Sequence, residues 1–210
     1  MDAPTRPARP RRGSTRRARA ALAAVLALAA ALVAAEPAWL HAKATLAQIL
    51  LRSAWADTLV RGDPIAPWPW ADTHPVARLR VPRLGVDQIV LAGDSGRTLA
   101  FGPGWAEASA APGNDRGTIV ISGHRDTHFA FLRSLAGDET ITLQSQGSVR
   151  EYRVVSRQVV DARDTGIALE AGTDHLVLVT CWPFDAPTAG GPLRYVVTAQ
   201  ALERHGPDAS

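Results

Sequence analysis

The sequence is almost without cysteine: one residue in 210, Cys181. An intramolecular disulfide is therefore impossible, which excludes a small domain held together by disulfides. The length and a hydrophobic content of 46% instead fit one compact domain with an appendage.

Most of the sequence also lacks an excess of positive charge. Seven arginines against Asp2 give residues 1–20 a formal charge of +6, so the remainder of this +3 chain carries −3. A nucleic-acid-binding domain needs a basic patch on its folded part. We therefore expect no nucleic-acid partner.

Charged residues are absent from residues 20–35, which are all Ala, Leu or Val. Such a helix is roughly 24 Å long, short of the ~30 Å hydrocarbon core, and continuation to residue 40 would lengthen it. We predict a basic cytoplasmic tail over 1–19 and a transmembrane anchor over 20–40. A cleaved signal peptide ending near Ala35 is the alternative. Both place the rest of the chain on the periplasmic side of an inner membrane.

The segment 41–70 separates this run from the main domain. Its first twenty residues carry apolar side chains at helical spacing and predict a helix that ends before Gly62. Three prolines and two tryptophans then indicate an extended connector.

Residues 71–204 lack internal repeats and long amphipathic helices. Short apolar runs separated by turn signals predict a mainly β domain, a closed or nearly closed and mostly antiparallel barrel, with 205–210 as a C-terminal tail. Strands are expected over 76–81, 86–91, 118–122, 140–143, 149–160, 176–180 and 193–200.

Cys181 stands at the end of a strand predicted to be buried on both faces. A lone cysteine is often a small core residue. A single thiol in an exported protein nevertheless suggests a function, and loops after strand ends often carry reactive groups. A thiol with its reference pKa of ~8.5 needs a neighbouring base or cation to act as a nucleophile.

His124 is the expected partner because it follows the strand 118–122. If this strand runs parallel to and beside the strand of Cys181, the two side chains meet. His128 is an alternative partner. His124, Asp126 and His128 also have the spacing of a metal half-site, but without a further ligand cluster we predict no metal.

Arg194 begins the last predicted strand, after an eleven-residue loop that follows Cys181. The last residue of one hairpin arm faces the first residue of the other, which predicts that Arg194 lies near Cys181. The loop is longer than ordinary hairpin connections, which suggests that it shapes a site. An ordinary surface arginine is the alternative.

Three motifs, GHRDTHF, LVTC and GGPLRYVV, resemble in order and spacing the His, Cys and Arg elements of sortases. Residues 67–105 further resemble the Gram-negative subgroup called class GN. One difference from the family pattern is Val177, where the usual Thr-Leu-x-Thr-Cys has its first threonine.

The resemblance implies an eight-stranded sortase barrel and a cysteine transpeptidase without a metal or organic cofactor. Cys181 would form a thioacyl intermediate with a signal resembling Leu-Pro-x-Thr-Gly, His124 would transfer protons, and Arg194 would stabilise the oxyanion. Thr180 would contact the substrate. Trp182, next to the cysteine, is expected to form a wall of the substrate groove, with a packed core side chain as the alternative. The implied partners are a secreted protein with a C-terminal sorting signal and an amine acceptor.

Two other functions compete with this one. An exported L,D-transpeptidase also uses a cysteine, but its motif places His-Gly before that residue, whereas Thr180 precedes Cys181 here. The other is a membrane-tethered β-barrel that binds a partner without catalysis.

Overall fold

The computed structural model describes residues 43–114, 116–166, 174–188 and 190–202, and in addition Arg19, Leu22, Leu26 and Ala29. The chain divides into two compact units, Met1–Leu46 and Ala47–Ser210. Apart from those four residues, the predicted basic tail 1–19 and membrane anchor 20–40 lie outside the described residues, as does the tail 205–210. Among the residues described, no helix combines the length and apolar character needed to cross a membrane.

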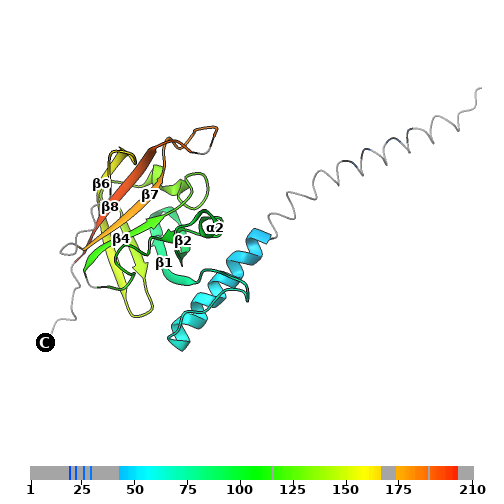
Figure 1. Cartoon of the computed structure of the whole chain (residues 1–210), viewed down its shortest axis with the longest axis horizontal. Helices are drawn as coiled ribbons and strands as arrows, with labels where there is room; N and C mark the ends of the chain where they lie inside the picture. The colour runs from blue at the N-terminus through cyan, green and yellow to red at the C-terminus, as the bar shows by residue number, and fades with distance from the viewer. Residues whose placement is uncertain are drawn as a thin grey trace, which may run out of the picture. The chain divides into compact units, whose positions relative to one another are not determined.

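The described part of the second unit forms eight strands in a closed barrel, in the order β1-β2-β3-β4-β7-β8-β6-β5 (Figure 1). The β2–β3 and β4–β7 pairs are parallel and the other pairs are antiparallel. This confirms the predicted mainly β, mostly antiparallel barrel. The strands are β1 (Pro75–Val81), β2 (Val86–Ala92), β3 (Gly104–Trp105), β4 (Gly117–Ser122), β5 (Thr140–Gln144), β6 (Val149–Asp161), β7 (Asp174–Cys181) and β8 (Leu193–Ala201).

Three short helical segments connect these strands, namely η1 (Pro82–Leu84), α2 (Gly96–Leu99) and η2 (Ala130–Ser134). The strand β3 has only two residues and was not predicted, because two residues show no alternation. The other seven strands agree with the predictions to within two residues at each end.

The barrel interior follows the alternation along each strand. In β1, Ala77, Leu79 and Val81 are fully buried, whereas Arg78 and Arg80 face outward, as predicted. Arg78 donates two hydrogen bonds to the Asp87 carboxylate, at 2.7 and 2.5 Å. The Arg78 guanidinium holds the pKa of Asp87 below its ordinary value.

The strand β7 is buried on both faces, as its lack of polar alternation predicted. Leu176 and Leu178 pack inside the barrel. Val177 packs on the outer side with Val120 and Val196 of the neighbouring strands β4 and β8. Cys181 therefore lies at the end of a strand that is held by hydrogen bonds on both edges and by packing on both faces.

Residues 43–61 are helical, and the helix ends before Gly62 as predicted. Within the second unit, Leu51 and Trp55 of this helix pack against Ile89 and Leu91 of β2. The Gln48 side chain also donates to the carbonyl of Phe101 at 2.7 Å. The helical residues from 47 onward are thus part of the compact barrel unit.

Candidate active site

The parallel neighbours β4 and β7 end at the same edge of the barrel. Ser122 pairs with Val179, and the Gly123 N–H donates to the Val179 carbonyl at 3.1 Å. His124 follows β4 directly, and Cys181 is the last residue of β7. The predicted parallel arrangement is confirmed, and it brings the two residues to one end of the barrel.

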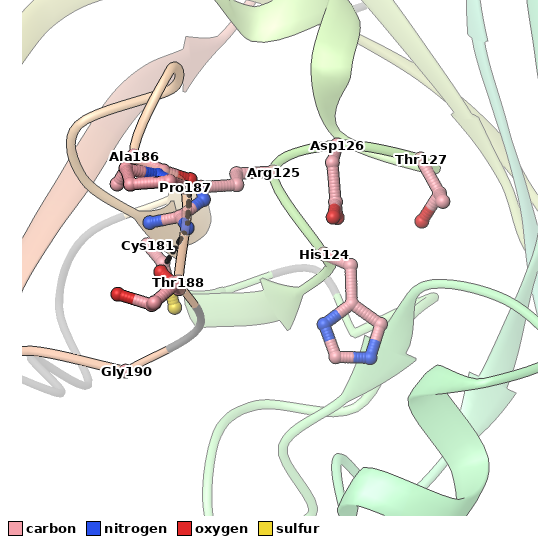
Figure 2. Close-up of a pocket in the computed structure, with 9 residues that line it drawn as sticks. All are labelled: His124, Arg125, Asp126, Thr127, Cys181, Ala186, Pro187, Thr188 and Gly190. Carbon is pink, nitrogen blue, oxygen red and sulfur yellow. Dashed lines mark hydrogen bonds between the residues drawn. The ribbon is translucent and has the colours of Figure 1, made fainter.

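His124 and Cys181 line the same pocket, which has a volume of about 340 Å³. His124 is exposed and Cys181 is half-buried. Figure 2 shows the imidazole and the sulfur on different sides of the pocket. The remaining lining residues are Arg125, Asp126, Thr127, Ala186, Pro187, Thr188 and Gly190.

Within the described part of the chain, no hydrogen bond joins the His124 ring to Cys181 Sγ. Catalytic hydrogen bonds are commonly long before a substrate binds. The pocket therefore brings a thiol and an imidazole together without a direct hydrogen bond between them in the described structure.

Gly123 and Phe129 shape the turn that carries His124. Phe129 is fully buried, and its N–H donates to the His124 carbonyl at 2.9 Å. A Cβ on Gly123 would lie 2.7 Å from the Phe129 ring, closer than real contacts allow. Gly123 and Phe129 of GHRDTHF therefore shape the turn of His124 together. The sequence analysis singled out His124 and gave these two residues no role.

Arg194 is the direct cross-strand partner of Cys181, which confirms the predicted pairing. Its guanidinium, however, donates to the carbonyls of Gly191 at 2.8 Å and Leu193 at 3.0 Å, and it does not line the Cys181 pocket. The strand register therefore places the Cα atom of Arg194 opposite Cys181, whereas backbone carbonyls next to it hold the guanidinium. Contact of Arg194 with a substrate stays a prediction.

An acidic group lies near Arg194. Hydrogen bonds from Arg163 lower the pKa of Asp161 to about 2, and the positive charge of Arg194 contributes in the same direction. Asp161 is the strand residue opposite Leu193, next to Arg194. A carboxylate therefore neighbours the Arg194 guanidinium at this end of β8.

Thr180 and Trp182 do not line the Cys181 pocket. Thr180 is 2% exposed, and its hydroxyl donates to the Gly123 carbonyl at 2.7 Å, so it supports the turn before His124. Trp182 stacks on Tyr195 with ring centroids 5.6 Å apart. The predicted substrate contacts of Thr180 and Trp182 remain predictions.

Trp182 instead lines a second cavity of about 380 Å³. Its wall is aromatic because the Phe184 ring also packs edge-on against Trp182, with centroids 5.5 Å apart. The other lining residues are Arg133, Pro183, Asp185 and Tyr195.

Arg125 is a pocket residue that the sequence-based reasoning did not identify. It is only 7% exposed, and its Nη2 donates to the carbonyls of Ala186 at 3.0 Å and Thr188 at 2.6 Å. An arginine within a polar loop resembles an ordinary surface residue. Its position next to His124 in the motif was the only available signal.

The alternative metal half-site gains no additional ligand. The described ranges contain no group of three or more His, Cys, Asp or Glu side chains placed to hold a metal ion. His124 and Asp126 line the Cys181 pocket, whereas His128 does not.

Burial lowers the pKa of His128, and the charge of the nearby His124 lowers it further. The unfolded chain therefore binds a proton at His128 at a higher pH than the folded chain does. This contribution to stability is complete above the ordinary histidine pKa of ~6.5 and is lost as the pH falls through the lowered pKa.

We expect His128→Gln to reduce the loss of stability between pH 7.5 and pH 5. The measurement is urea unfolding of the wild type and the variant at each pH. A His74→Gln variant is the control, and equal pH slopes for wild type and His128→Gln would contradict the prediction.

The fold and the pocket together describe a closed β-barrel protein with a cysteine and a histidine at the ends of adjacent parallel strands. The sequence profile described as "Sortase domain" matches residues 79–202, more than half of the chain. The chain belongs to the sortase family.

Relatives of known name agree with this assignment. The chain is 34% identical over 121 residues to Sortase D of Bacillus subtilis (strain 168), an alignment covering 57% of this chain and 60% of that protein. Sortase A from Corynebacterium diphtheriae aligns with a TM-score of 0.58 and 26% identity, over 66% of each chain. The chain thus spans less than two thirds of the length of these two proteins.

A third relative shares the fold. The Clostridium perfringens Sortase D5 transpeptidase aligns with a TM-score of 0.62 over 76% of this chain and 99% of that one, at 18% identity. The sortase-like, eight-stranded barrel is thereby established. Both named relatives of class D differ from the class GN suggested by residues 67–105.

Proposed function

We propose that this protein is a cysteine transpeptidase that cleaves a sorting signal resembling Leu-Pro-x-Thr-Gly and transfers the cleaved chain to an amine. The observation that supports this proposal is the shared pocket of Cys181 and His124 at the ends of β7 and β4. Membership of the sortase family supports the reaction class.

The first step forms a bond between Cys181 Sγ and the carbonyl carbon of the scissile peptide bond. Collapse of the tetrahedral intermediate breaks the carbon–nitrogen bond, and His124 gives a proton to the departing amine. In the second step an incoming amine attacks the thioester, loses a proton to His124 and displaces the Cys181 thiolate. The reaction consumes no oxidant or reductant.

The test is capture of the thioester. The purified full-length protein is incubated with a sorting-signal peptide, quenched in acid and examined by intact-mass spectrometry. The proposal predicts an added mass equal to the acyl part of the peptide, located on Cys181. If no peptide from a broad library acylates Cys181, the proposed function is wrong.

Arg194 is proposed to donate to the oxyanion after its side chain leaves the carbonyls of Gly191 and Leu193. The pairing of its Cα with that of Cys181 supports this proposal. We expect Arg194→Ala to lower kcat/KM by at least ~100-fold, the usual effect of removing one oxyanion donor. The measurement is peptide cleavage at subsaturating concentration.

Arg163→Ala is the control for this variant. Arg163 also neighbours Asp161, but its side chain is 72% exposed and lies outside the pocket. Near-wild-type turnover of Arg194→Ala would remove Arg194 from the mechanism.

We also propose that the protein is a class GN sortase, anchored in the inner membrane by residues 20–40, with its barrel in the periplasm. The substrate would be a secreted protein with a C-terminal sorting signal, as the sequence resemblance implies. A membrane-impermeant maleimide should label Cys181 in intact spheroplasts. Labelling only after lysis would contradict this location.

A further inference from the structure

The charged side chain of Arg125 is buried at the end of the barrel that carries Cys181. The proposed chemistry gives this charge no role. Burying a guanidinium costs free energy unless the group is well paired. Among the described residues its hydrogen-bond partners are two backbone carbonyls, Ala186 and Thr188, and no carboxylate forms an ion pair with it. Figure 2 shows both hydrogen bonds as dashed lines beside Cys181.

The Nη1 atom of Arg125 is also buried, and among the described residues it has no hydrogen-bond partner. Buried donors in stable folds are nearly always paired, because an unpaired N–H loses its hydration without compensation. A side chain that contributed only to stability would be better replaced by an apolar one. The arrangement therefore points to a role in the pocket.

The two segments joined by Arg125 form opposite parts of the candidate active site. Arg125 follows His124 in the chain, whereas Ala186 and Thr188 lie in the loop that follows Cys181. Hydrogen bonds between the β4 and β7 sides extend as far as Gly123, which donates to the Val179 carbonyl and accepts from the Thr180 hydroxyl. Beyond the ends of the strands, Arg125 continues the connection.

We propose that Arg125 is a positioning residue that holds residues 186–188 as one wall of the Cys181 pocket. This inference rests on the proposed transpeptidase function, because it assigns that wall to the binding of the peptide substrate. Without the two hydrogen bonds, the loop would occupy the binding-competent position for a smaller fraction of time. The apparent affinity for peptide falls by that same fraction.

The expected kinetic result separates this role from a general structural one. For Arg125→Met we expect KM to rise about tenfold while kcat stays within about threefold of wild type. A variant that is simply less well folded would show a lower apparent kcat and an unchanged KM. Arg125→Lys, which keeps the charge and a donor, should recover part of the loss in KM.

Arg97→Met is the matched control. Arg97 forms an ion pair with Asp72 at 2.8 Å, and these side chains are 78% and 56% exposed. Exposed ion pairs contribute little. We expect KM in this variant to stay within about twofold of wild type.

Amide hydrogen exchange without peptide supplies a second measurement that does not depend on the proposed function. The amides of residues 184–186 and 188 should exchange faster in Arg125→Met and at the wild-type rate in Arg97→Met. Unchanged exchange in Arg125→Met, or a lowered kcat with unchanged KM, overturns the positioning role. If the wild type cleaves no peptide, the proposed function fails and exchange alone decides whether Arg125 holds the loop. If Arg125→Met does not fold, Arg125→Lys takes its place in both measurements, with smaller changes in the same direction expected and no change in either overturning the positioning role.

Discussion

Replacing Cys181 by alanine is expected to lower peptide cleavage and transfer by more than ~10³-fold. The only thiol in the chain is lost, and neither water nor a neighbouring hydroxyl takes its place as a nucleophile of comparable strength. The thioester should also be absent from the intact-mass spectrum. Both measurements are made on the purified full-length protein with the same peptide.

The barrel should survive this change. Cys181 is half-buried at the end of β7, where the backbone pairing to Arg194 does not depend on the side chain. Thermal unfolding of the alanine variant should therefore resemble that of wild type. Wild-type cleavage, or intact cellular function with alanine at this position, would favour the non-catalytic binding barrel instead.

The second large effect is expected for His124→Ala. A positioned acid and base contributes about 10²–10⁴-fold, so kcat/KM should fall by that factor. His124 is exposed and lines the Cys181 pocket, where the proposed reaction needs its proton transfers. The measurement is peptide cleavage at subsaturating concentration.

His128→Gln is the matched control, because His128 lies four residues away and outside the pocket lining. Its kcat/KM should remain within about threefold of wild type. A larger loss in His128→Gln than in His124→Ala would reverse the assignment and make His128 the catalytic partner.

The strands were predictable because their signals are local. Alternation in β1 and the uninterrupted apolar run of β7 each reflect the burial of particular faces. Both patterns are present in six to eight consecutive residues, so no tertiary information was needed. The two-residue β3 has no such pattern, and it forms because the pairing of β2 and β4 requires a strand between them.

The pairing of Cys181 with Arg194 was also predictable, because hairpin geometry relates the two arms through the loop alone. The meeting of Cys181 with His124 was a conditional prediction. It required β4 and β7 to be parallel neighbours, although 51 residues lie between the end of β4 and the start of β7 in the sequence. Only the closure of the barrel determines that adjacency.

The ends of long side chains were not predictable. Arg194 turns to carbonyls of its own loop, Trp182 faces a second cavity, and Arg125, which no sequence pattern singled out, is buried. Each depends on which carbonyls and rings the loop after Cys181 presents, and that loop has no periodicity from which its path follows.

By itself, the sequence determined the mainly β class, the positions of seven strands and the three candidate residues, because these depend on side-chain periodicity and on chemistry carried by single residues. The tertiary structure alone decided that His124 and Cys181 share a pocket, that Thr180 supports a turn, and that Arg125 joins the two sides. Contacts between segments distant in the chain are set by barrel closure and packing, which no local pattern records.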